Sequence, residues 1–300
     1  MHAKSTGLVC AVVGALGFSF KAIFVKAAYR YGVDAETLLA LRMLYALPLF
    51  LLLGLMATRQ SATPISAADW RALAALGMFG YYASSYLDFL GLRHISAALE
   101  RVILFVNPSI VVLFTAWRSR TMPTRATWGA LLLCYAGVAF TGLHDLRFGG
   151  AQVLLGGSLV FASAVCFAIY LLRAGSLLTR LGSAPVAAWA TAIACVLVIA
   201  QFLLLRPVTA LAMQPWQVQV LSAAMAVFST VLPIWLVSEA IRRLGAGPTA
   251  MIGSLGPVIT MLMAWLWLGE PLGILQLLGA TLVIFGVRLV ATTAPNRAEA

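Results

Sequence analysis

Charged residues are scarce in this 300-residue chain, where Asp, Glu, Lys and Arg together make up 10% of the sequence. A soluble domain carries roughly 25% charged residues, and its apolar share is about 45–50%. Here the hydrophobic share is 62%, and the mean hydropathy is +0.99. The composition therefore excludes a water-soluble fold and indicates a membrane protein with little mass outside the bilayer.

Motifs for nucleotide hydrolysis and for common hydrolase chemistry are missing. No Gly-Lys pair occurs, which excludes a P-loop and therefore an ATP-driven pump within this chain. Neither HExxH nor GxSxG occurs, and the histidines are confined to His2, His94 and His144. We therefore expect neither an enzyme nor a bound cofactor.

Cysteines are few, and their spacing carries no site. All four (Cys10, Cys134, Cys166 and Cys195) lie inside apolar stretches, where a thiol behaves as a small hydrophobic group. No disulfide framework and no metal-ligand spacing is visible among them. We expect no metal site.

Long apolar runs dominate what is present. A transmembrane barrel uses strands of about ten alternating residues, whereas these runs are continuous and about twice that length, so they predict membrane-spanning helices. The first run is followed by Lys21 and Lys26 without a convincing cleavage site, so we expect it to be a retained helix. The predicted fold is an all-α polytopic membrane protein, with ten helices at about 6–28, 35–57, 70–91, 95–117, 126–143, 151–172, 184–205, 216–240, 246–267 and 272–292.

Basic residues are unevenly divided between the two sides of this predicted bundle. Twelve precede the first helix, follow an even-numbered helix or lie near the C-terminus; six lie on the other side, and Lys21 and Arg42 lie within helices. The net charge of +11 therefore indicates membrane topology rather than nucleic-acid binding. By the positive-inside rule both termini, including a polar tail at 293–300, are predicted in the cytoplasm of a bacterial-type inner membrane.

The sequence also repeats itself at a displacement of about 149 residues, so that Pro108 matches Pro257. The predicted units are residues 1–147 and 148–292, with five helices each. Because five is an odd number, the two units enter the membrane in opposite directions. Inverted repeats are typical of transporters, whose substrate site lies near the midplane between the halves.

Residues 246–287 have a distinctive pattern, in which small residues open a helix, Pro257 lies within it, and Gly269-Glu270-Pro271 forms the next turn. This pattern resembles the EamA-type module of the drug/metabolite transporter superfamily. Residues 96–138 are similar but carry Arg-Ser-Arg-Thr-Met-Pro at that turn. The resemblance implies two EamA units and export of amino acids and related metabolites, as in the aromatic amino acid exporter group. Other branches of the superfamily move nucleotide sugars, phosphorylated sugars or drug cations.

Three charged residues, Lys21, Arg42 and Glu100, lie within spans at a similar predicted depth. Charges there are costly, so they are functional candidates by default. One interpretation is a wet vestibule that contacts the carboxylate and ammonium of a zwitterion; the other is an ion-pair cluster that locks the first four helices. Glu100 is the first candidate for proton coupling and Asp88 the second, but the neighbouring Arg101 favours an ionised Glu100 and therefore facilitated export.

The mid-helix prolines Pro108 and Pro257 remove backbone hydrogen bonds and free the carbonyl groups of Leu104 and Gly253. Such carbonyls need protein or a wet cavity around them, so the two broken helices are candidate cavity walls; a packing kink is the alternative. Asn107 adds a polar amide beside the first kink.

Aromatic residues recur on the predicted third helix, where Phe79, Tyr82 and Tyr86 follow i, i+3, i+7 spacing on one face. They would suit an apolar or aromatic substrate side chain, although ordinary packing explains them equally. Thr230 on the predicted eighth helix offers a hydroxyl with the same two interpretations.

These features together predict an inner-membrane exporter of amino acids that works by alternating access. Its partners would be a small-molecule substrate and the lipid bilayer, with no nucleic acid, and a monomer is the expected state. The alternative function is efflux of hydrophobic or quaternary cationic compounds, which would favour an aromatic and acidic cavity and would not need Lys21 or Arg42. Loss of substrate on neutralising a cavity cation would distinguish the two.

Overall fold

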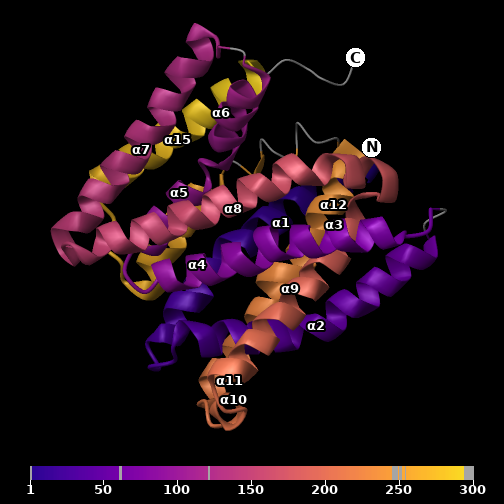
Figure 1. The fold of residues 1–300 in the computed structure, drawn as a ribbon. Coiled ribbons are helices and arrows are strands. Elements are labelled where there is room, and N and C mark those ends of the chain that lie inside the picture. The colour runs from indigo at the N-terminus through magenta and orange to yellow at the C-terminus, as the bar shows by residue number, and fades with distance from the viewer. Residues whose placement is uncertain are drawn as a thin grey trace.

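The computed structural model describes residues 2–60, 63–120, 122–244, 249, 252–253 and 255–293, and every regular element within these ranges is a helix (Figure 1). The helices of the first half are α1 His2–Tyr29, α2 Ala35–Gln60, α3 Ala67–Gly77, η1 Met78–Ala83, α4 Ser84–Gly91, α5 Ala97–Leu104, α6 Asn107–Ser119 and α7 Arg125–Gly149. Those of the second half are α8 Gln152–Leu181, α9 Ser183–Leu205, α10 Thr209–Ala212, α11 Trp216–Ala226, η2 Val227–Val231, α12 Leu232–Leu244, α14 Gly256–Met263, η3 Ala264–Leu268 and α15 Ile274–Thr293.

Local sequence signals account for where several helices begin and end. The side chains of Ser66, Ser96 and Thr124 accept hydrogen bonds from backbone N–H groups three residues later, which begins α3, α5 and α7. Gly150 and Gly182 have positive φ angles, a conformation that favours glycine, and end α7 and α8. The predicted boundary at 147/148 therefore lies in the last turn of α7, and the chain turns a few residues later.

Seven helical stretches in the described ranges are long and apolar enough to cross a membrane. They are Thr6–Tyr29, Ala35–Gln60, Ala97–Arg118, Arg125–Arg147, Gln152–Leu181, Ser183–Leu205 and Trp216–Ile241, with shorter apolar helices at Gly256–Leu268 and Ile274–Leu289. The predicted span at 70–91 is helical as α3, η1 and α4, but it carries too many polar residues to join the seven. The start of the predicted span at 246–267, and residues 294–300 of the predicted tail, lie outside the described residues.

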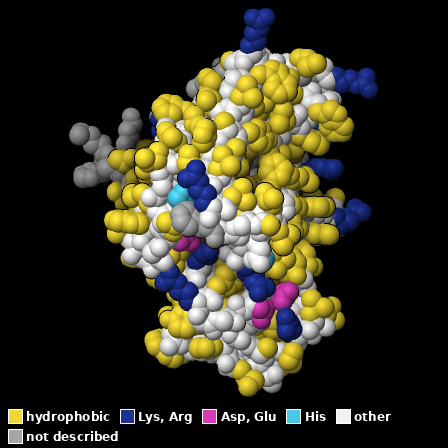
Figure 2. Space-filling view, turned by 90° about the vertical axis from the view of Figure 1, so that its left-hand side faces the viewer, with side chains coloured by type: hydrophobic (Ala, Val, Ile, Leu, Met, Phe, Trp, Pro, Cys, Tyr) yellow, Lys and Arg dark blue, Asp and Glu magenta, His cyan; other side chains and the backbone are white. Residues whose placement is uncertain are grey.

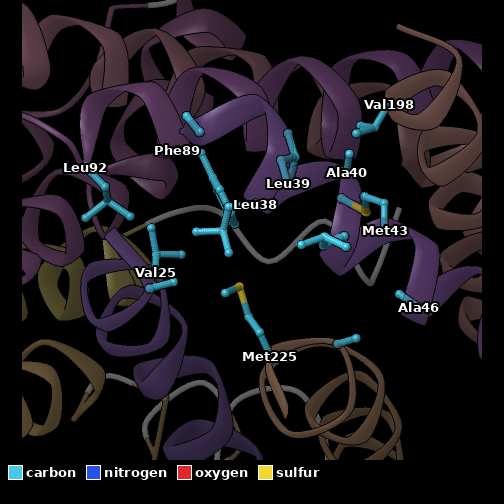
Figure 3. Close-up of a cluster of buried hydrophobic side chains, with 14 of the residues drawn as sticks. Val25, Leu38, Leu39, Ala40, Met43, Ala46, Phe89, Leu92, Val198 and Met225 are labelled. Atoms are coloured by element: carbon cyan, nitrogen blue, oxygen red, sulfur yellow. The ribbon is translucent and has the colours of Figure 1, made fainter. Parts of the chain in front are cut away.

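Helices of the two halves pack against one another throughout the bundle. Figure 1 shows α7 and α15 side by side at one edge, while α2 packs on α9 and α1 packs on α12. The largest core cluster, part of which is drawn in Figure 3, joins side chains of α1, α2 and α4 to those of α9 and α11. Val25, Leu38, Phe89, Val198 and Met225 belong to it. Both halves therefore build the largest core cluster.

Structural features recur at the displacement of the sequence repeat. The π-helical segments η1 and η2 begin at Met78 and Val227, and α6 and α14 begin at Asn107 and Gly256, so each pair is separated by 149 residues. A π-helical segment inserts one residue into a helical turn and is uncommon. Its recurrence at equivalent places shows that the halves share helix irregularities as well as sequence.

The surface of the bundle is largely hydrophobic. Figure 2 shows hydrophobic side chains over much of one face, with basic side chains projecting at its edge. Exposed large side chains include Trp117, Leu132, Leu204 and Ile274. Because so much exposed apolar surface is incompatible with water, the surface agrees with a protein embedded in lipid.

Candidate functional site

The central feature of the interior is a cluster of charges on α1, α4 and α5. The ammonium nitrogen Nζ of Lys21 lies 2.6 Å from Oδ2 of Asp88 and 2.8 Å from Oε1 of Glu100. Side-chain exposure is 16% for the lysine, 3% for Asp88 and 0% for Glu100. Two buried carboxylates thus share one ammonium group.

The acid pair retains hydrogen-bonding capacity. Lys21 donates a hydrogen bond to Asp88, whereas Glu100 Oε1 lies at ion-pair distance without the alignment of a hydrogen bond. Oδ1 of Asp88 and Oε2 of Glu100 are buried, and neither accepts a hydrogen bond from any described residue. Buried carboxylate oxygens without donors are costly, which makes the pair a place where a further donor would be stabilised.

Arg42 on α2 lies beside this cluster but binds the other half of the chain. Its Nε and Nη2 atoms donate to Oγ1 of Thr230 at 3.2 and 3.0 Å, and its guanidinium lies 5.4 Å from the ring centre of Phe89. The Thr230 hydroxyl donates in turn to the carbonyl of Met225, five residues earlier in the π-helical turn. The buried Nη1 of Arg42 has no hydrogen-bond partner within the described ranges, so it is available to a carboxylate.

Arg101 on α5 lies at the junction with α14. A Cβ atom placed on Gly256 would lie 2.9 Å from Nη2 of Arg101, so the guanidinium packs against the backbone where α14 begins. Its buried Nε has no hydrogen-bond partner among the residues described. The side chain of Arg101 therefore packs across the contact between α5 and α14.

The connector between η3 and α15 holds α5, the helix that carries Glu100. Glu270 in this connector accepts a hydrogen bond from the backbone N–H of Ala97 at 3.0 Å, and its carboxylate lies 3.5 Å from Nζ of Lys26. Asp145 on α7 accepts from both the backbone and the hydroxyl of Ser96, at 2.8 and 2.9 Å. Two carboxylates from other elements thus accept hydrogen bonds from two backbone N–H groups at the start of α5.

Two hollows open at the same end of the bundle. One has a volume of about 360 Å³ and lies between Lys26, Arg30, Arg93 and Glu270; the other, of about 240 Å³, shares Lys26, Arg93 and Glu270 and reaches His144. Their lining carries more basic than acidic side chains. A negatively charged group would be attracted to this end of the helices.

The two mid-helix prolines break their helices as the sequence predicts. Pro108 stands in the first turn of α6 after a break at residues 105–106, and Pro257 stands in the first turn of α14. The Oδ1 atom of Asn107 is buried at the first of these breaks, and no described residue donates a hydrogen bond to it. Among the cavities described above none joins the two breaks, so their role as cavity walls stays a prediction.

The predicted aromatic face is divided by the π-helical segment. Tyr82 and Tyr86 stack with ring centres 6.5 Å apart and pack on the main core cluster. Phe79 is 39% exposed on the surface. The inserted residue of η1 changes the angle between successive side chains, so i, i+3, i+7 spacing no longer keeps all three on one face. The structure therefore groups the tyrosines and leaves Phe79 apart.

The structure brings some of the predicted charges together and adds others. Lys21 and Glu100 meet, but the contacts of Arg42 are to Thr230 and Phe89 rather than to either of them. Asp88 and Arg101 are the further charged residues of this group. In the described part of the chain, no cluster of three or more His, Cys, Asp or Glu residues could hold a metal ion. The sequence did contain a signal for Asp88. Its negative charge, like that of Glu100, needs a cation such as Lys21 in the same membrane leaflet.

Comparisons with known proteins agree with this architecture. The model of the EamA-like transporter family matches the chain twice, at residues 5–143 and 154–292. The uncharacterized transporter YcbK of Bacillus subtilis is 32% identical over 94% of this chain and 91% of its own length. The threonine/homoserine exporter RhtA of Escherichia coli is 28% identical over 67% of this chain, which spans 64% of the length of RhtA.

A crystal structure with 18% sequence identity has the same fold, with a TM-score of 0.63 over 98% of this chain and 99% of the other. The two family matches together cover most of the 300 residues, and they begin 149 residues apart, as the π-helical segments and the broken helices do. The resemblance found in the sequence is therefore confirmed, and the chain belongs to the EamA-like transporter family.

Proposed function

We propose that this protein exports amino acids and related metabolites across a bacterial inner membrane by alternating access. The observation that carries the proposal is the interior cluster of both charge signs, with free acceptors on Asp88 and Glu100 and a free donor on Arg42. A zwitterion needs both kinds of partner. The name of RhtA, a threonine/homoserine exporter, supports the same substrate class.

In this proposal the ten predicted spans form two inverted five-helix units, with both termini in the cytoplasm. The support is the recurrence of η1 in η2 and of the α6 start in the α14 start. Discontinuous helices near the midplane are a feature of inverted-repeat transporters, because their ends present unpaired backbone groups to the substrate. Rocking of one unit against the other would open each side in turn.

The cationic side chains would recognise the carboxylate of the substrate. Arg42 contributes the free Nη1, and Arg101 lies across the interface at Gly256. The Asp88–Glu100 pair would recognise the ammonium group. Tyr82, Tyr86, Asn107 and Thr230 supply polar and aromatic groups along the pathway, and Pro108 and Pro257 shape its broken helices.

The test is counterflow of a radiolabelled amino-acid panel into liposomes that contain the purified protein, with a lipophilic cation as control. We expect saturable amino-acid flux that Arg42→Gln abolishes. Flux of the lipophilic cation alone, unchanged in Arg42→Gln, would contradict the proposal and favour cation efflux.

Energy coupling can be tested in the same liposomes by imposing a proton gradient. Facilitated export predicts flux that follows the substrate gradient alone. A flux that follows the proton gradient, with that dependence lost in Glu100→Gln, would show proton coupling through this carboxylate.

A further inference from the structure

We propose that Asp88 and Glu100 form a binding site for a primary ammonium group, and that Lys21 is its tethered resting occupant, which the substrate displaces. The inference rests on the proposed function only in naming the amino group of the substrate as the natural displacing group. It differs from a fixed ion-pair lock because the lysine must leave during each cycle.

The chemistry of the occupant is the first argument. The Nζ atom of Lys21 is itself a primary alkylammonium group, and it lies 2.6 and 2.8 Å from one oxygen of each carboxylate. A substrate with a free amino group presents the same three N–H donors on a tetrahedral nitrogen. The geometry that suits the lysine therefore suits the substrate as well.

The second argument is the arrangement of burial. Both acids are almost fully enclosed, whereas the side chain of Lys21 is 16% exposed. Lysine carries a compact charge on a flexible four-carbon stem, so its ammonium group can withdraw without a change in the backbone. Withdrawal of Lys21 would therefore leave the two acids enclosed but without their cation.

The third argument is electrostatic, because the acids cannot remain without a cation. Two adjacent buried carboxylates are unstable when their partner is removed. The other cations nearby contact other groups: Arg42 donates to Thr230 and packs on Phe89, and Arg101 packs on Gly256. An ammonium group from a ligand would replace the positive charge that the acids lose when Lys21 withdraws.

Displacement would also change how the helices are tied together. Lys21 links α1 to α4 and α5, and α1 packs on α12 and α14 of the second half. A ligand that occupies the acid pair removes this link and frees α1 to move relative to α4 and α5. Substrate binding would thus be coupled to rearrangement of the bundle.

The experiment is chemical rescue of the full-length Lys21→Met variant, which keeps the apolar stem and removes the ammonium group. Thermal unfolding in detergent is followed with a fluorogenic thiol reagent, in methylammonium chloride and in tetramethylammonium chloride at equal ionic strength. We expect methylammonium chloride to raise the melting temperature of the variant by at least about 3 °C relative to sodium chloride. Tetramethylammonium has no N–H donor, so it should leave the melting temperature of the variant unchanged. Neither salt should change the melting temperature of the unsubstituted protein, because Lys21 occupies its site.

The matched control is Lys21→Met combined with Glu100→Gln, which removes one carboxylate and should lose the methylammonium response. Equal responses to the two salts, or no response in Lys21→Met, would overturn the proposal. If Lys21→Met does not fold in sodium chloride, its recovery as monodisperse protein in methylammonium chloride supports the proposal, and failure in both salts overturns it. The readout is binding alone, so it stays positive even if amino-acid flux is absent, and a failed rescue leaves the flux test unaffected.

Discussion

The carboxylate of Glu270 accepts a hydrogen bond from the backbone N–H of Ala97 at 3.0 Å, so a turn of the second family copy caps a helix of the first. The same carboxylate lies 3.5 Å from Nζ of Lys26 on α1. Glu270 belongs to the Gly-Glu-Pro turn that carried the family resemblance. It therefore positions α5 and, through α5, Glu100 of the acid pair.

Replacement of Glu270 by alanine should destabilise the protein by about 1–2 kcal/mol, because the N–H of Ala97 loses its acceptor and Lys26 loses its partner. The measurement is thermal unfolding in detergent, monitored through the labelling of the buried thiols of Cys10, Cys134 and Cys195 as they become accessible. Glu270→Gln is the matched control, since its amide oxygen can still accept from Ala97. An equal loss in both variants would contradict a capping role.

The same carboxylate should make stability depend on pH. Burial raises the pKa of Glu270 above its ordinary value of 4.5, while Lys26 and the N–H of Ala97 oppose the rise. A carboxyl whose pKa is raised on folding contributes stability that is complete below its unfolded pKa and is lost as pH increases through the folded pKa. The melting temperature of the protein, relative to Glu270→Gln, should therefore fall from pH 4.5 towards neutrality. A difference that does not change over this range would contradict the expected direction.

Thr230→Val should weaken the contact between α2 and η2. The substitution is nearly isosteric but removes the acceptor of two Arg42 nitrogens, which leaves a buried guanidinium with fewer partners. The expected loss is about 1–3 kcal/mol in the free energy of unfolding, together with reduced amino-acid flux in liposomes. Thr230→Ser keeps the hydroxyl and should retain most of both. A valine variant as stable and active as the serine variant would show that Arg42 does not depend on this residue.

Gly286→Ala should separate α7 from α15. An added Cβ would lie 2.7 Å from the carbonyl oxygen of Ala130 and 2.6 Å from Sγ of Cys134, and a backbone oxygen on a packed helix cannot easily move. We expect a loss of about 1–3 kcal/mol in the free energy of unfolding, as for other overpacked sites. The control is Gly142→Ala on α7. There the added Cβ has no atom within 4 Å among the described residues beyond its own helical backbone, and alanine should be neutral or stabilising by up to about 1 kcal/mol.

The folds of individual segments follow closely from local sequence. Apolar runs of about twenty residues can satisfy their backbone groups in lipid only as helices, which is why the sequence predicts the helical class. The helix breaks at Pro108 and Pro257 follow from the missing N–H of proline, and the displacement of 149 residues is visible in the sequence and again in the paired starts of α6 and α14. Each of these features depends on residues close together in the chain.

The pairing of charged side chains does not follow from local sequence, because it depends on contacts between segments that are distant in the chain. The sequence indicates that Lys21 and Glu100 are costly in a membrane and need partners, and it therefore marks them as important. It does not specify that Asp88 shares the lysine, that Arg42 turns to Thr230, or that Arg101 crosses to Gly256. Those choices follow from the way α1, α4, α5 and α14 pack, and a π-helical insertion at η1, invisible to a regular helical period, moves Phe79 away from the tyrosines. Local chemistry thus determines which residues must be satisfied, and tertiary packing decides what satisfies them, because the alternative partners lie within reach only once the helices are assembled.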